Sequence, residues 1–272
     1  MSAPVAVYYE ISGPERAPVV LLSNSLGTTT ALWDAQVPAL AKEFRVVRYD
    51  LRGHGRSPLP AGPGPTEIAD LGGDLLALMD RLGVERAHLC GVSIGGMASM
   101  WLAANAPERV GRLVACCTSA KFPDPRMWAE RAATVRANGL EPIADAGLAR
   151  WFTPGWLARN PRRAAAMRAM LCATPPEGYA ALCEALGRMD LRPELPRIAA
   201  PTLVIVGADD PATPLEQGQV IAAGIPGARL AVVDDAAHLA VIEQADTVTK
   251  LILAHLRGDE DHKEDQDDRR HR

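Results

Sequence analysis

The stretch AHLCGVSIGGMASMWLAAN, residues 87–105, holds a short apolar run, a turn in which glycines surround Ser93, and a run of good helix formers. Within it, Gly91-Val92-Ser93-Ile94-Gly95 fits the pattern G-x-S-x-G. Between a strand and a helix, this pattern predicts a sharp, strained turn that lifts a serine hydroxyl above a β-sheet. The glycines let the strand and the helix approach closely. Ser93 is therefore a candidate nucleophile at the edge of a sheet.

Short β-rich runs and helical stretches alternate on both sides of this turn. Strands are expected at residues 5–11, 18–22, 45–49, 87–90, 112–117, 202–206 and 230–233. Helices are expected at residues 68–82, 97–105 and 247–256, and the first of them stops at Gly83, a residue typical of helix ends. This alternation predicts an α/β fold with a mostly parallel central sheet and helices on both faces.

The strand pattern disappears between residues 121 and 197. This segment holds helical runs rich in Ala, Arg and Trp that prolines interrupt, and it separates two sheet-forming halves, 1–120 and 198–256. We therefore expect a helical cap, residues 121–197, inserted into an α/β core. Residues 257–272 carry seven acidic and five basic groups and almost no apolar side chain. They cannot bury enough surface to fold, so a disordered charged tail is expected.

The composition is that of a globular protein, with 48% hydrophobic and 23% charged residues. A net charge of −4 disfavours nucleic acid or an anionic membrane as the main partner. No run reaches the roughly 18 apolar residues of a membrane span, and the N-terminal residues lack the pattern of a signal peptide. Five cysteines without C-x-x-C spacing indicate neither a zinc site nor a disulfide framework. We expect a cytoplasmic protein with reduced thiols.

A serine nucleophile needs a base, normally a histidine that a carboxylate orients. In α/β folds with a G-x-S-x-G turn, the chain order is Ser, then Asp or Glu, then His. His238 follows the last expected strand and comes well after Ser93, so it is the candidate base. His54 precedes Ser93 in a glycine-flanked loop, and we expect it to brace that loop.

The candidate acid lies in VGADDP, residues 206–211, which follows an expected strand and precedes His238. Adjacent side chains point in different directions, so only one of the two carboxylates is expected to reach the imidazole. The residues alone do not choose between Asp209 and Asp210. All of these candidates fall at carboxyl ends of strands, where an open α/β sheet places its ligand crevice.

With these residues in view, the chain resembles the α/β-hydrolase superfamily in segments 50–57, 91–96 and 206–214. More narrowly, SNSLGT at 23–28, ATPPEGY at 173–179 and DDPATP at 209–214 are similar to the 3-oxoadipate enol-lactonases of the β-ketoadipate pathway of bacterial aromatic catabolism. The resemblance implies hydrolysis of a small carboxylate-bearing lactone through an acyl-enzyme, without a metal or a cofactor. The alternatives are another serine carboxylesterase, a cofactor-free perhydrolase and a hydrolase-like ligand-binding receptor.

The resemblance also implies a role for individual residues. In the family pattern G-x-x-D-P-A-T-P the acid of the triad matches Asp210, which completes a triad with Ser93 and His238. Leu26 and Ile94 match the two positions whose backbone N–H groups form the oxyanion hole. Ile94 departs from the methionine common in these lactonases, but the backbone donor is unaffected by the side chain.

The substrate carboxylate implied by the resemblance needs a cationic or hydrogen-bonding partner. Lys121 and Arg131 are candidate partners at the start of the expected cap, and Trp128 is a candidate wall of the pocket. Further candidates for the same two roles are Arg126, Arg136, Trp151 and Trp156. The expected partner is a small-molecule lactone, and the sequence leaves the oligomeric state open.

Overall fold

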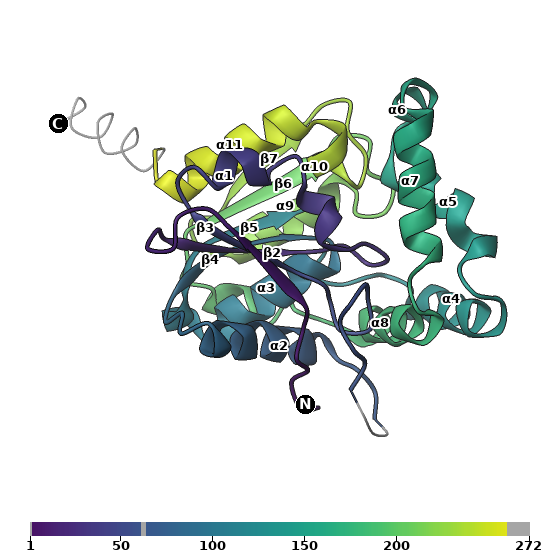
Figure 1. Ribbon diagram of the computed structural model, residues 1–272, viewed down its shortest axis with the longest axis horizontal. Coiled ribbons are helices and arrows are strands. Elements are labelled where there is room, and N and C mark those ends of the chain that lie inside the picture. Colours follow the sequence, from purple (N-terminus) through teal and green to yellow (C-terminus); the bar gives the residue numbers. More distant parts are fainter. Residues whose placement is uncertain (1, 61–63, 260–272) are drawn as a thin grey trace.

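The computed structural model describes residues 2–60 and 64–259, and a seven-stranded sheet lies at its centre (Figure 1). The strand order is β1-β3-β2-β4-β5-β6-β7. β1 pairs antiparallel with β3, and every other neighbouring pair is parallel. The strands are β1 (Tyr9–Ser12), β2 (Val19–Ser23), β3 (Arg45–Tyr49), β4 (Ala87–Val92), β5 (Val110–Cys116), β6 (Thr202–Gly207) and β7 (Arg229–Val233). The predicted α/β architecture with a mostly parallel sheet is confirmed.

The register of the sheet brings the carboxyl ends of its central strands to one edge. Ser23 of β2 is level with Gly91 of β4, which is in turn level with Ala115 of β5. Gly207, the last residue of β6, is level with Val233, the last residue of β7. The loops that follow these strands therefore start side by side, and they carry every candidate catalytic residue.

Helices cover both faces of the sheet (Figure 1). α1 (Val37–Leu40) and α11 (Ala245–Arg257) lie on one face, and α2 (Ile68–Arg81) and α3 (Ile94–Asn105) on the other. α9 (Leu215–Gly224) contacts β6 and β7. Because both faces are covered, the central strands are largely apolar, and β6 is buried at every position.

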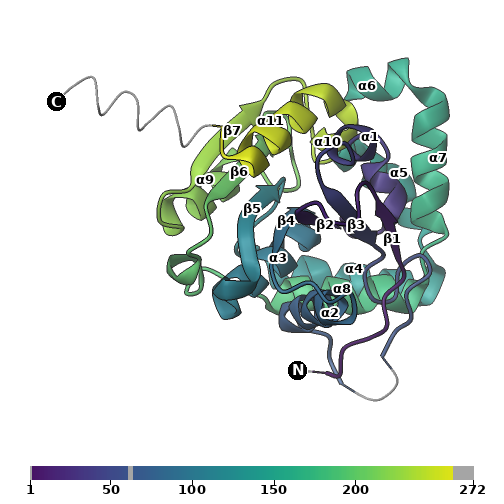
Figure 2. The ribbon, with the colours of Figure 1, turned by 60° about the vertical axis from the view of Figure 1, so that its left-hand side comes forward.

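Five α-helices follow β5 and precede β6, and they curve around one side of the sheet (Figure 2). We refer to them as the cap. They are α4 (Pro125–Asn138), α5 (Glu141–Trp151), α6 (Pro154–Arg159), α7 (Pro161–Cys172) and α8 (Pro176–Arg188). Every one of them carries a proline in its first two positions. Proline is accommodated there because those N–H groups have no partner within a helix, so the prolines start helices instead of interrupting them.

The first strand is shorter than the sequence predicts. Strand pairing begins at Tyr9, whereas residues 5–8 run beside the sheet without joining it. The reason is that side chains take their backbone donors: the N–H of Val5 donates to Asp74 at 2.8 Å, and that of Tyr8 donates to the hydroxyl of Ser57 at 2.8 Å. The sequence reading also missed three short helices, α1, α9 and α10 (Ala240–Glu243).

The C-terminal helix extends further than predicted. Arg257, placed at the start of the expected tail, is the last residue of α11 and pairs with Glu43 at 2.5 Å. Gly258 follows in the left-handed conformation that ends many helices. Most of the predicted tail, residues 260–272, lies outside the described residues.

Candidate active site

Ser93 occupies the turn between β4 and α3 with a strained backbone, at φ 56° and ψ −122°. This conformation is costly for a residue with a side chain, so the surroundings must hold it. The N–H of Ser93 donates to the carbonyl of Cys116 at 3.0 Å, and its carbonyl accepts from the hydroxyl of Thr118 at 2.7 Å. Neighbouring β5 and the loop after it thus keep the turn in place.

The glycines of the motif make room for this turn. A Cβ atom on Gly91 would lie 2.3 Å from the carbonyl oxygen of Gly95. One on Gly95 would lie 2.5 Å from the carbonyl oxygen of Ser23. Both distances are far inside van der Waals contact, so the two positions exclude any side chain. The spacing in the motif therefore follows from close approach of α3 to β4 and to the end of β2.

Asp210 and His238 form a buried hydrogen-bonded pair. The Nδ1 atom of His238 lies 2.9 Å from Oδ2 of Asp210, and the hydroxyl of Thr213 donates to the same oxygen at 2.7 Å. The other oxygen, Oδ1, accepts the backbone N–H groups of Ala212 at 2.8 Å and Thr213 at 3.0 Å. Asp209 is exposed and does not contact the imidazole. The geometry thus favours Asp210, the residue that the resemblance selects.

Opposing effects act on the charges of this pair. Burial lowers the pKa of His238 and raises that of Asp210. The attraction between the two groups and their shared hydrogen bond act in the opposite direction and prevail. As a result, the pKa of His238 lies above its usual value and that of Asp210 below it. The aspartate is held ionised, as an acid that supports a protonated imidazole must be.

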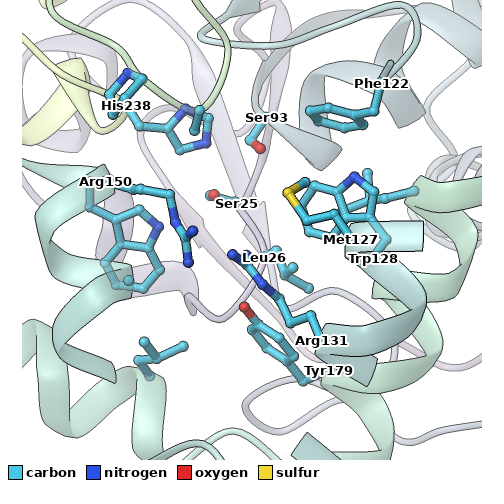
Figure 3. Close-up of a pocket in the computed structure, with 16 residues that line it drawn as sticks. Ser25, Leu26, Ser93, Phe122, Met127, Trp128, Arg131, Arg150, Tyr179 and His238 are labelled. Atoms are coloured by element: carbon cyan, nitrogen blue, oxygen red, sulfur yellow. The ribbon is translucent and has the colours of Figure 1, made fainter. Parts of the chain in front are cut away.

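Ser93 and His238 line the same pocket between the core and the cap (Figure 3). The cavity has a volume of about 180 Å³. Its lining includes Ser25, Leu26, Ser93, Phe122, Met127, Trp128, Arg131, Arg150, Trp151, Leu171, Tyr179, Pro211 and His238. Leu26 follows β2 and Ile94 opens α3, so the two candidate oxyanion donors come from loops at the same sheet edge as Ser93. The first N–H groups of a helix have no partner within it, which suits that of Ile94 to bind an anion.

Two arginines of the cap face Ser93 across the pocket (Figure 3). Arg131 comes from α4 and Arg150 from α5, and both are half-buried. Arg131 also interacts with the hydroxyl of Tyr179 and lies 5.1 Å from the ring centre of Trp128. Burial, followed by the proximity of Arg131, lowers the pKa of Arg150. Within the described residues neither arginine forms an ion pair with a carboxylate.

The remaining cationic candidates lie elsewhere. Lys121 is outside the pocket lining, and its ammonium pairs with Asp190 at 3.1 Å. Arg126 pairs with Asp124 in front of α4, and Arg136 binds two glutamates on α8. Sequence reasoning missed Arg150. Arg150 directly precedes Trp151, a candidate for the pocket wall, and this neighbour in the sequence could have indicated that Arg150 lies near the pocket.

Of the three candidate tryptophans, two line the pocket and one does not. Trp128 and Trp151 line the pocket, whereas Trp156 stacks on Phe152 with ring centres 4.1 Å apart. His54 is fully buried, and its Nδ1 lies 3.2 Å from the carbonyl of Arg52, so it holds the loop after β3. Burial lowers the pKa of His54 to about 4, which keeps it neutral.

Two further properties concern the part of the chain that the structure describes. None of its helices is long and apolar enough to cross a membrane. Nor does it hold a group of three or more histidine, cysteine or acidic side chains arranged to bind a metal ion.

Fold and sequence together define the class of this protein. The model of the α/β hydrolase fold family matches residues 18–245, and the chain belongs to that family. It is 39% identical over 250 residues to 3-oxoadipate enol-lactonase 2 of Acinetobacter baylyi, covering 92% of each chain. The crystal structure of the enol-lactonase from Burkholderia xenovorans is similar with a TM-score of 0.90 and 44% identity, covering 94% of this chain and 100% of that one. A malate-bound esterase from Thermogutta terrifontis follows with a TM-score of 0.87 and 30% identity, covering 95% and 98%.

Proposed function

We propose that this chain hydrolyses a small lactone bearing a free carboxylate, and that the lactone is 3-oxoadipate enol-lactone. The observation that carries the proposal is the placement of Arg131 and Arg150 in the pocket opposite Ser93, as two guanidinium groups that pair with no carboxylate among the described residues. Guanidinium groups bind carboxylates strongly through paired, charge-assisted hydrogen bonds. The similarity to enol-lactonases supports the same substrate class.

The reaction begins with attack of Ser93 on the lactone carbonyl. His238 takes the hydroxyl proton, while Asp210 holds the imidazole in the tautomer whose free nitrogen can accept it. The charge that develops on the carbonyl oxygen is stabilised by the backbone N–H groups of Leu26 and Ile94. Loss of one such donor costs serine hydrolases about 3–4 kcal/mol of barrier.

Ring opening expels an enolate, a better leaving group than an alkoxide, and the imidazolium of His238 gives it the proton taken from Ser93. The resulting enol remains tethered to the acyl group on Ser93, so ring closure competes with hydrolysis until water attacks. The neutral His238 then takes a proton from the attacking water and passes it to Ser93 as the acyl-enzyme is cleaved, and the released enol tautomerises to the ketone 3-oxoadipate. Arg131 and Arg150 hold the substrate carboxylate, with Trp128 beside them as a wall of the pocket.

The test is an assay of the purified protein on the enol-lactone, followed by the loss of its ultraviolet absorbance, with p-nitrophenyl acetate as a neutral ester. In R150M, loss of a charge-assisted contact raises KM for the enol-lactone about 10- to 150-fold. KM for the neutral ester stays within about twofold. K121M is the matched control, because Lys121 lies outside the pocket. If R150M raised KM equally for the enol-lactone and for p-nitrophenyl acetate, Arg150 would not bind the substrate carboxylate.

The same assay separates the alternatives. Turnover of enol-lactone no faster than that of simple esters would favour a general carboxylesterase, and fast turnover of acetate with peroxide would favour a perhydrolase. A ligand-binding receptor would stall after one cycle. All five cysteines are free thiols, which is typical of a reducing compartment, so we place the reaction in the cytoplasm. The proposed partner is the small-molecule substrate, not nucleic acid or a membrane.

A further inference from the structure

Glu243 connects the loop that carries His238 to the cap. It is the last residue of α10, five positions after the histidine. One of its carboxylate oxygens accepts the backbone N–H of Ala237 at 2.8 Å. The other accepts the backbone N–H of Thr153 at 2.9 Å and also the hydroxyl of Thr153. A single side chain thus bridges a core loop and the segment between α5 and α6.

A second link runs parallel to the first. The N–H of Leu239 donates to the carbonyl of Trp151 at 2.9 Å. Both chain neighbours of His238 are therefore hydrogen-bonded toward cap residues 151–153, one directly and one through Glu243. Trp151 itself lines the pocket, and the hydroxyl of Thr153 accepts the N–H of Trp156 as the N-terminal cap of α6. The bridge is thus attached to an ordered part of the cap.

The histidine loop needs such support. Residues 236–239 lie between β7 and α10, outside regular secondary structure. At its Nδ1 the ring is held by Asp210, but a hydrogen bond at one atom leaves the imidazole free to tilt unless its backbone is also fixed. Reaction geometry is sensitive to such shifts, because a displacement of about 1 Å can cost about a hundredfold in rate.

We propose that Glu243 is a positioning residue, which ties the cap to the catalytic histidine so that a correctly seated cap places the imidazole beside Ser93. The proposal rests on the proposed function, in which His238 is the base of ester hydrolysis. A carboxylate is needed at this position because both of its oxygens face donors. An amide in its place would turn an NH₂ group toward a backbone N–H on one of the two sides, and one half of the bridge would break.

The experiment compares E243Q with E216Q, which removes a negative charge from the exposed start of α9. For E243Q we expect kcat on both the enol-lactone and p-nitrophenyl acetate to fall roughly tenfold to a hundredfold, while each KM stays within about twofold. E216Q retains wild-type kinetics. Thermal unfolding of each variant reports the folded fraction. At the other end of the bridge, T153S keeps the hydroxyl and is expected to remain active, whereas T153V lacks it and is expected to lose activity.

The pH profile distinguishes positioning from a merely structural role. The titratable and charged groups with the largest effect on the pKa of His238 are Asp210, Cys117 and Arg150, and E243Q changes none of these three. A displaced imidazole has a weaker bond to Asp210, so the acid limb of kcat moves to lower pH in E243Q. A smaller folded fraction would lower kcat and leave the limb in place.

Three results overturn the proposal: kcat of E243Q within twofold of wild type, a loss fully explained by unfolded protein, or an unmoved acid limb. Failure of the proposed substrate is distinguishable. If wild type hydrolyses p-nitrophenyl acetate through Ser93 but leaves the enol-lactone intact, the substrate is wrong while the comparison on p-nitrophenyl acetate still decides the role of Glu243. If S93A hydrolyses both esters as fast as wild type, both proposals fall.

Discussion

Replacement of Asp210 by asparagine tests the hydrogen-bonded relay at its buried end. Oδ1 of Asp210 accepts two backbone N–H groups, those of Ala212 and Thr213. The amide oxygen of an asparagine must take that position, because an amide nitrogen there would face two donors. The amide nitrogen is then left at the position of Oδ2, 2.9 Å from Nδ1 of His238.

This orientation reverses the hydrogen bond to the imidazole. Nδ1 of His238 becomes an acceptor, so the proton of the neutral ring moves to the other nitrogen, which can then no longer take the proton of Ser93. The same tautomer error in a serine protease costs about 10⁴-fold in kcat. At about 1.4 kcal/mol per factor of ten, that is about 5 kcal/mol of barrier.

D209N is the matched control, since Asp209 is an exposed neighbour whose carboxylate does not touch the imidazole. Its kcat is expected to remain within about twofold of wild type, with KM unchanged. D210N keeps both hydrogen bonds to backbone N–H groups, so its Tm should stay within about 4 °C. Hydrolysis of enol-lactone and p-nitrophenyl acetate measures kcat. If D210N retains a tenth of wild-type kcat, or if D209N is the more damaging change, the reasoning is refuted.

Three further predictions concern the same site. S93A abolishes hydrolysis of both esters and leaves the circular dichroism spectrum unchanged; substantial residual turnover would show that another group attacks. The raised pKa of His238 means that the neutral base is lost as pH falls, so kcat/KM drops through a midpoint above 6.5, and a midpoint below 6.5 would contradict the pairing with Asp210. G95A lowers the free energy of unfolding by about 1–3 kcal/mol in urea titrations, because its Cβ meets the carbonyl of Ser23; G73A on α2, with open space around it, should not destabilise the protein.

At the edge of the sheet, some features could be predicted from local sequence patterns and others could not. The strand runs, the turn at Ser93 and the position of His238 after the last strand are all visible in the sequence, because each depends on residues adjacent in the chain. The start of the first strand, at Tyr9 instead of residue 5, could not be predicted from the sequence. It depends on Asp74 and Ser57, which take backbone donors of residues 5–8 from a distance in sequence.

The choice between Asp209 and Asp210 shows the same limit. Their local sequences are nearly equivalent, and the residues alone left both open. In the structure one side chain is buried against His238 and Thr213, whereas the other is exposed. Resemblance to a family selected Asp210, and three-dimensional contacts give the physical reason for that choice.

By itself, the sequence determined the α/β architecture and the candidate nucleophile and base, since backbone conformation, apolar periodicity and chain order are local properties. Only the tertiary structure decided which charged side chains converge on the pocket. Arg150 lines the pocket, and Glu243 bridges the histidine loop and the cap, because α5 and α10 pack where they do, while Lys121 pairs with Asp190 outside the pocket. Which charged side chains reach the site depends on how helices distant in the sequence pack together, and no local sequence pattern predicts that packing.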